Sequence, residues 1–241
     1  FPLHGLILLT GKPGTGKTSL ARGLASRVAG SLKSSTPFYY LEVEPHGLAD
    51  SGLGKSQRAV TELLGSTVRE QAGSNPTIVL LDEVETLAGS MSRMSLEANP
   101  IDVHRATDAV LAQLDNLAAE VPSLLFIATS NFPDAIDDAF LSRCDLIETV
   151  GLPERPAVEA ILKDTLQALA KVAPKVEGLT SNPQFSELVE VAVGLDGRQL
   201  RKLVISACAS SKETALDANR LTLDALIQAA RASRQEKGGR P

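Results

Sequence analysis

The chain has 241 residues, enough for one large domain or for a medium domain and a small one, and its 43% hydrophobic and 22% charged residues exclude an intrinsically disordered protein. A formal net charge of −5 argues against general nucleic-acid binding, and 3% aromatic residues without tryptophan argue against stacking platforms for bases or sugars. Two cysteines, Cys144 and Cys208, are too few for a zinc site or a disulfide framework and fit a reducing, cytoplasmic setting.

Neither a membrane anchor nor a secretory signal is expected. The longest apolar stretches, such as 5–9 and 123–128, are far shorter than the roughly 20 residues that span a bilayer. The chain begins at Phe1, without an initiator methionine, and a strand-like run follows almost at once. We therefore expect that a segment precedes Phe1 in the natural protein.

The first part of the chain, about 150 residues, alternates strand-like and helix-like segments. Apolar runs predict strands at 6–10, 38–43, 77–81 and 123–129, and the pattern between them predicts helices at 18–29, 57–71 and 102–117. The run 77–81 is bounded by Pro76 and Asp82, as expected of a strand buried on both faces. This alternation predicts an α/β fold with a parallel, helix-covered sheet.

The pattern changes around Pro153. Beyond it, helices are predicted at 155–172, 184–193, 198–211 and 222–234, and no strand is expected. We therefore predict a large α/β domain over residues 1–152 and a small all-helical domain over residues 153–235. Residues 236–241 are charged and glycine-rich and predict a flexible tail.

Residues 11–18, Gly-Lys-Pro-Gly-Thr-Gly-Lys-Thr, match the phosphate-binding pattern GxxxxGK[ST] directly after a strand and at the start of a helix. Such a loop turns backbone N–H groups toward phosphate oxygens, and the helix adds the positive end of its dipole. Lys17 is expected to reach the β- and γ-phosphates, and Thr18 to bind Mg²⁺. The full match in this context disfavours an ordinary glycine-rich turn. The predicted nucleotide-binding residues are Pro13, Gly14, Thr15, Gly16, Lys17, Thr18 and Ser19.

Two carboxylates, Asp82 and Glu83, follow the apolar strand 77–81, at the strand end where open parallel sheets bind ligands. Asp82 suits the Mg²⁺ shell, and Glu83 suits orienting and deprotonating the water that attacks the γ-phosphate. Without the phosphate loop, a helix N-cap would explain Asp82 about equally well. Together the two motifs predict hydrolysis of a nucleoside triphosphate.

These motifs, the polar end of the next strand and the helical second part together resemble AAA+ ATPases over essentially the whole chain. The resemblance implies ATP and Mg²⁺ as cofactors and assigns three further roles. Asn131 would sense the γ-phosphate or the attacking water, Arg143 would be an arginine finger that reaches the nucleotide of a neighbouring subunit, and Arg198 would be a second sensor on a helical lid. A finger that acts across an interface implies a ring, usually hexameric in this class.

Each of these three residues also has a plain structural alternative. Asn131 could simply turn the chain after a strand. Arg143 could pair on the surface with Asp138 or Asp145, and Arg198 could be an exposed residue after a glycine turn.

A finer resemblance is to the pachytene checkpoint AAA+ ATPases. It is carried by residues 81–87, 99–100, 102–115, 129–131, 136–137 and 197–203. Members of that family partly unfold HORMA-domain proteins and convert a closed, partner-bound state into an open one. Bacterial relatives act on HORMA proteins in nucleotide-signalling defence against phage, and the short loops here are a weak sign of a bacterial relative. The resemblance implies a HORMA-domain protein as partner. The short apolar stretches predict no membrane association, and the acidic net charge disfavours direct contact with nucleic acid.

One segment departs from that family, whose members carry an aromatic residue in the pore loop that grips the substrate chain. Gly52 stands at that place here, so Leu53 is the large apolar side chain left for grip, which should be weaker than that of a ring. A surface loop without a substrate role is the alternative. Met91 and Met94 suggest a second pore loop, although a mobile loop with incidental methionines explains them equally well.

The preferred hypothesis is an ATP-driven ring that changes the conformation of a HORMA-domain protein. A DNA clamp loader is the runner-up, because residues 142–144 also resemble the finger motif of that family, but the acidic net charge argues against it. An ATP-gated scaffold with little turnover is a third hypothesis. It is disfavoured by the joint presence of Lys17, Asp82, Glu83, Asn131 and Arg143.

Overall fold

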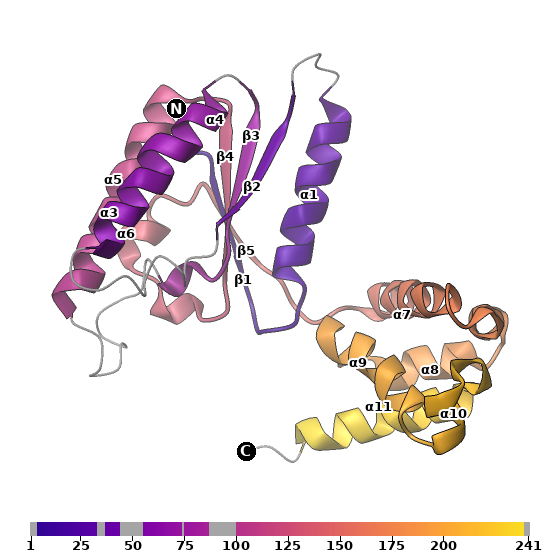
Figure 1. The fold of residues 1–241 in the computed structure, drawn as a ribbon. Helices are drawn as coiled ribbons and strands as arrows, with labels where there is room; N and C mark the ends of the chain where they lie inside the picture. The colour runs from indigo at the N-terminus through magenta and orange to yellow at the C-terminus, as the bar shows by residue number, and fades with distance from the viewer. Residues whose placement is uncertain (1–3, 33–36, 44–54, 74, 87–99, 239–241) are drawn as a thin grey trace. The chain divides into compact units, whose positions relative to one another are not determined.

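The computed structural model describes residues 4–32, 37–43, 55–73, 75–86 and 100–238 (Figure 1). The chain divides into two compact units, one formed by residues 1–13 and 17–150 and the other by residues 14–16 and 151–241. Within the described ranges, no helix has the length and apolar character that crossing a membrane requires.

The first unit is built on a sheet of five parallel strands in the order β2-β3-β4-β1-β5 (Figure 1). The strands are β1 (Leu6–Thr10), β2 (Tyr39–Val43), β3 (Thr77–Leu81), β4 (Leu124–Ser130) and β5 (Leu146–Thr149). β3 is buried along its whole length, as expected for an apolar strand covered on both faces. Because all five strands run the same way, their carboxyl ends lie at one edge of the sheet.

Four of the strands lie where the sequence predicts them, and β5 has no counterpart among the predictions. Its four residues, Leu-Ile-Glu-Thr, are all exposed, and it lies at the edge of the sheet. A short edge strand of this kind shows neither a buried apolar run nor a clear alternation, so local sequence carries little signal for it.

Helices cover both faces of the sheet. α1 (Lys17–Ser31) lies on one face, and α3 (Lys55–Glu62), α4 (Arg69–Ala72), α5 (Pro100–Glu120) and α6 (Asp138–Leu141) lie on the other (Figure 1). Each face has its own apolar core. Ala21 and Ala25 of α1 pack against Ile78 and Ile127, whereas the larger core on the other face includes Phe126.

The helix predicted at 57–71 is present, but a π-helical turn, Leu63–Val68, separates α3 from α4. Gly65 lies in this turn, where a Cβ atom would come within 2.8 Å of Gln113 Oε1 on α5. The missing side chain therefore permits a close approach between the turn and α5.

The second unit is helical throughout its described residues. It contains α7 (Arg155–Ala170), α8 (Phe185–Ala192), α9 (Gly197–Cys208), α10 (Lys212–Leu216) and α11 (Leu223–Gly238), with 3₁₀ segments at Pro174–Ser181 and Ala218–Arg220. A separate apolar core, which includes Leu162, Leu188 and Leu203, holds these helices together. The four predicted helices are present, and α11 extends three residues into the expected tail. Together with the sheet, this unit confirms the predicted fold class.

Candidate active site

The order of the strands places three strand ends side by side. β4 lies between β3 and β1, with Ser130 opposite Thr10 and Ala128 opposite Leu81. The phosphate loop follows β1, the carboxylates Asp82 and Glu83 follow β3, and Asn131 follows β4. Groups as far apart in sequence as 114 positions therefore come within hydrogen-bonding distance.

The phosphate loop makes its bends at glycines. Gly11, Gly14 and Gly16 have φ angles of 145°, 83° and 101°, a region that other residues rarely adopt. The N–H of Gly11 donates to the carbonyl oxygen of Ser130 at 3.2 Å, which fixes the start of the loop on β4. α1 begins directly after the loop, at Lys17, so the positive end of a helix dipole lies at the predicted phosphate site.

Lys17 is a buried cation, with a residue exposure of 5%. Its Nζ donates to the carbonyl oxygens of Gly11 and Lys12 at 2.8 and 3.0 Å and to Oδ1 of Asn131 at 2.8 Å. Burial lowers the pKa of Lys17, and the three carboxylates that follow β3 oppose this shift. Three acceptors match the three protons of an ammonium group, so the side chain is held in one place.

Asp82 is held by two threonine hydroxyls. Thr18 Oγ1 donates to both carboxylate oxygens, at 3.0 and 3.3 Å, and Thr129 Oγ1 donates to Oδ1. Thr129 also accepts the backbone N–H of Glu83 at 3.1 Å, so one side chain of β4 holds both the carboxylate of Asp82 and the backbone of Glu83. The hydroxyl of Thr18 and the carboxylate of Asp82 form a pair of hard oxygen donors.

Glu83 has a φ angle of 54°, the one positive value among the non-glycine residues that the structure describes. Such strain persists where the surroundings impose it, often at functional sites. Oε1 of Glu83 accepts a hydrogen bond from Nδ2 of Asn131 at 3.0 Å, while Oδ1 of Asn131 accepts from Lys17. Asn131 thus links the phosphate-loop lysine to the predicted base, beyond merely turning the chain after β4.

Two residues of this site, Thr129 and Glu85, have no role in the sequence analysis. Oε1 of Glu85 accepts the backbone N–H of Asn131 at 3.1 Å. Oε2 of Glu85 is buried without a hydrogen-bond partner in the described structure. A sequence signal for Thr129 exists, because alternate residues along an extended strand share a face and Thr129 stands two positions before Asn131. Glu85 lies two residues after Glu83, but only the course of the 3₁₀ turn Val84–Thr86 shows that it contacts Asn131.

The donor set fits a magnesium–nucleotide complex. The glycine loop, the helix start and Lys17 supply donors and positive charge for phosphates, and Thr18 with Asp82 supplies oxygen ligands for a cation. In the part of the chain that the structure describes, no group of three or more His, Cys, Asp or Glu side chains could hold a metal by itself. Proteins commonly hold Mg²⁺ through one or two carboxylates together with substrate phosphates, and the carboxylate of Asp82 beside the hydroxyl of Thr18 fits that pattern.

Arg143, the predicted finger, follows α6 and is paired with a residue of α5. Its Nε and Nη2 donate to Oδ1 and Oδ2 of Asp115 at 2.7 and 2.8 Å, and its Nη1 donates to the carbonyl oxygen of Ala139 at 2.8 Å. These bonds raise the pKa of Arg143 and lower the pKa of Asp115. The partner of Arg143 is therefore Asp115, and not Asp138 or Asp145 as the sequence alternative supposed.

Arg198, the predicted second sensor, is an exposed residue in the first turn of α9. A capping box starts this helix: Oδ1 of Asp196 accepts the N–H of Gln199 at 2.8 Å, and Oε1 of Gln199 accepts the N–H of Asp196 at 2.9 Å. Gly194, with a φ angle of 92°, precedes it. The motif thus accounts for the start of α9, and the sensor role of Arg198 stays a prediction.

Leu53, Met91 and Met94, the residues of the two predicted pore loops, lie outside the described residues. Their roles in gripping a substrate therefore also stay predictions.

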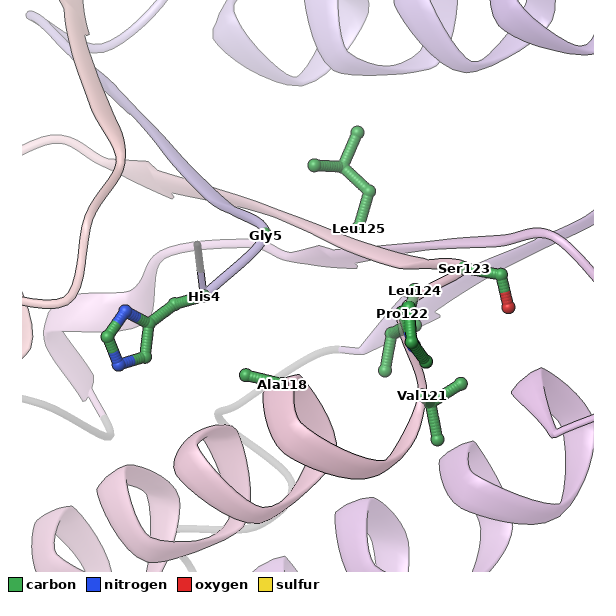
Figure 2. Close-up of a pocket in the computed structure, with 8 residues that line it drawn as sticks. All are labelled: His4, Gly5, Ala118, Val121, Pro122, Ser123, Leu124 and Leu125. Carbon is green, nitrogen blue, oxygen red and sulfur yellow. The ribbon is translucent and has the colours of Figure 1, made fainter. Parts of the chain in front are cut away.

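A cavity of about 280 Å³ lies at the opposite edge of the sheet (Figure 2). His4 and Gly5 before β1, Ala118 and Val121 near the end of α5, and the start of β4 line it. Nucleotides bind at the carboxyl ends of parallel strands, so this cavity at the amino ends is not the nucleotide site.

We expect Thr129→Val to slow the predicted hydrolysis of ATP at least about tenfold, because a buried hydrogen bond to a charged group typically contributes roughly 1.5–3 kcal/mol. The variant removes the hydroxyl that holds Asp82 and receives the N–H of Glu83. Steady-state kcat at saturating ATP measures the effect. Thr165→Val is the matched control, since the Thr165 hydroxyl donates to a helix carbonyl, that of Ile161. Equal turnover in both variants would contradict the role of Thr129.

Comparison with known proteins places this geometry in a family. The model of the ATPase family associated with various cellular activities (AAA) matches residues 7–152. CD-NTase-associated protein 6 of Pseudomonas aeruginosa is 57% identical over 234 residues, which are 97% of this chain and 77% of that protein. A pachytene checkpoint protein 2 homolog of Oryza sativa subsp. indica is 34% identical over 268 residues, covering 97% of this chain and 56% of the relative.

Two solved structures share the fold of this chain. The structure of C. elegans PCH-2 has a TM-score of 0.71 at 26% identity and covers 98% of this chain and 63% of that one. A chain of the E. coli MS115-1 HORMA:CdnC:Trip13 complex has a TM-score of 0.69 and shares the fold at 19% identity, covering 94% of this chain and 73% of that one. The chain spans little more than half of the rice relative. It belongs to the AAA family of ATPases, in the group that includes the pachytene checkpoint protein 2 homologs and CD-NTase-associated protein 6.

Proposed function

We propose that this chain hydrolyses ATP to ADP and phosphate. The observation that carries the proposal is the hydrogen-bonded series from Lys17 through Asn131 to Glu83, with the Thr18–Asp82 pair beside it. A phosphate-binding cation, a polar amide and a carboxylate are thereby joined at the end of one sheet. These are the groups that phosphoryl transfer to water requires.

The residues of the chain have distinct tasks in this reaction. The loop from Pro13 to Ser19, with Lys17, binds the phosphates. Thr18 and Asp82 would hold Mg²⁺, and the bound ion would supply positive charge against the charge that develops on the transferred group. Glu83 accepts a proton from the attacking water, and Asn131, whose amide nitrogen contacts Glu83, orients both. Arg143 stabilises the developing charge on the nucleotide of a neighbouring subunit.

ATP hydrolysis by a ring of these chains, hexameric as in related ATPases, drives the remodelling of a HORMA-domain protein. The setting of this activity is bacterial antiphage defence in the cytoplasm. Two comparisons support this proposal. The relative with 57% identity is named as associated with a CD-NTase, and a chain of the same fold occurs in a HORMA:CdnC:Trip13 complex. Arg198 would couple the nucleotide state to the lid, and Leu53, Met91 and Met94 would contact the substrate chain.

ATP turnover of the full-length protein tests the proposal. It is measured alone, with a HORMA-domain protein, and with primed DNA and a sliding clamp, with Lys17→Ala as the blank in each case. Stimulation of at least several-fold by the HORMA-domain protein is expected. Stimulation by DNA and clamp alone would instead identify a clamp loader. No turnover in any mixture would leave an ATP-gated scaffold and contradict the proposal.

A further inference from the structure

The pairing of Arg143 with Asp115 has a geometry that a chance surface contact would rarely reach. The guanidinium and carboxylate meet edge to edge through two hydrogen bonds, of 2.7 and 2.8 Å, and their side chains are 23% and 42% exposed. Bidentate pairs of this kind fix the orientation of the guanidinium plane as well as its position. The two residues are 28 positions apart, so the contact joins α5 to the segment that follows α6.

The backbone beside Arg143 is fixed as well. The N–H of Arg143 donates to the carbonyl of Phe140 at 3.1 Å. The carboxylate of Asp145 accepts the N–H groups of His4 and Leu6 at 3.1 and 3.0 Å, and the N–H of Asp145 donates to the carbonyl of Leu6 at 2.9 Å. The segment that carries Arg143 is thus tied to the start of β1, near the cavity of Figure 2.

The bonded edge leaves part of the guanidinium available. A guanidinium has five N–H donors. The carboxylate of Asp115 accepts one from Nε and one from Nη2, and the carbonyl of Ala139 accepts one from Nη1. Two donors remain for an acceptor outside these contacts. A long arginine side chain loses considerable rotational entropy when it is ordered, and the bonds to Asp115 and Ala139 impose that order from within the subunit.

We propose that Asp115 is a positioning residue for Arg143: it holds the Nε–Nη2 edge so that the remaining donors are presented to the nucleotide of a neighbouring subunit. The proposal rests on the proposed finger role of Arg143. His4 Nε2 lies 3.5 Å from Asp115 Oδ1 and leaves both hydrogen bonds to Arg143 in place.

The opposite reading is a latch, in which Asp115 competes with phosphate for Arg143 and restrains the finger. The two readings predict changes of opposite sign. If Asp115 positions Arg143, its loss lowers turnover; if it restrains Arg143, its loss raises turnover.

The test compares Asp115→Asn, Arg143→Ala and the control Asp108→Asn in the full-length assembled protein. Asp108 is an exposed aspartate on the same helix. We expect Asp115→Asn to lower kcat about tenfold with KM for ATP changed less than about twofold, since misplacing a catalytic group mainly affects the chemical step. Asp115→Glu, which keeps the charge, should recover part of the rate. Thermal unfolding and size-exclusion profiles verify folding and assembly, and Asp115→Glu decides the question if the asparagine variant does not fold.

Rings that mix two kinds of subunit distinguish an effect of Arg143 on the active site of a neighbour from an effect of the substitution on its own subunit. Lys17→Ala subunits are expected to bind no nucleotide but still to supply Arg143 to a neighbouring subunit. Wild-type subunits are therefore mixed with Lys17→Ala subunits in one series and with subunits that carry both Lys17→Ala and Asp115→Asn in another. The double variant should lower the turnover of the wild-type neighbours further. Unchanged turnover with Arg143→Ala would refute the finger itself. A strong loss with Arg143→Ala but unchanged or faster turnover with Asp115→Asn would overturn the positioning role alone.

Discussion

Replacing Glu83 with glutamine will stop ATP turnover while leaving ATP binding intact. The amide keeps the size of the side chain and one oxygen that can accept from Nδ2 of Asn131, but it cannot take a proton from water. General-base catalysis contributes roughly 10²- to 10⁴-fold, so we expect kcat to fall by about 100-fold or more. The phosphate loop and the Thr18–Asp82 pair are untouched, so the Kd for ATP should change little.

Two measurements check this prediction. Phosphate release gives kcat, and titration with a fluorescent ATP analogue gives the Kd. Glu177→Gln, at an exposed position in the second unit, is the matched control and should behave as wild type. Blocked hydrolysis should also trap the partner protein on the ATP-bound form, detectable as co-elution. Substantial residual turnover in Glu83→Gln would remove Glu83 as the base.

Replacing Lys17 with alanine will abolish nucleotide binding itself. The variant removes the buried positive charge at the phosphate loop, and a lost charge-assisted contact costs at least about 3 kcal/mol when it leaves phosphates uncompensated, which is more than 100-fold in Kd. It also frees Oδ1 of Asn131, whose position depends on Lys17. Both ATP and ADP should bind too weakly to detect at micromolar concentration.

Calorimetric titration with ATP and with ADP measures this effect. Lys202→Ala, which removes an exposed lysine from α9, is the control for a general loss of positive charge. Undiminished affinity in Lys17→Ala would show that Lys17 does not bind the phosphates.

Local sequence patterns were sufficient to locate the candidate site residues that directly follow their own strand. Lys17 follows from its loop motif, and Asp82 and Glu83 follow from a buried strand that ends in two acids. Asn131 required the resemblance to a family, and the structure then placed its amide between Lys17 and Glu83.

Thr129, Glu85 and Asp115 could not be assigned from local patterns, because their contacts depend on which elements become neighbours. The position of β4 between β3 and β1 brings Thr129 to Asp82 across 47 positions. For Arg143 the sequence offered Asp138 and Asp145, both close in the chain, whereas the partner in the structure is Asp115 of α5, 28 positions away. The exposed edge strand β5 escaped prediction for the same reason: it is defined by pairing with β1, not by its own apolar pattern.

The three filled hydrogen bonds of the Lys17 ammonium affect the heat of nucleotide binding. An ammonium has three donors, and here Gly11, Lys12 and Asn131 already accept them. A phosphate oxygen that accepts a hydrogen bond from Lys17 must displace one of these acceptors, so nucleotide binding exchanges one hydrogen-bond partner for another. The enthalpy gained at this lysine is therefore the difference between the new hydrogen bond to phosphate and the hydrogen bond to the acceptor that it displaces. If the displaced acceptor is Oδ1 of Asn131, the same exchange frees that oxygen to contact the attacking water of the proposed reaction, and the orientation of the water toward Glu83 then depends on a filled phosphate loop.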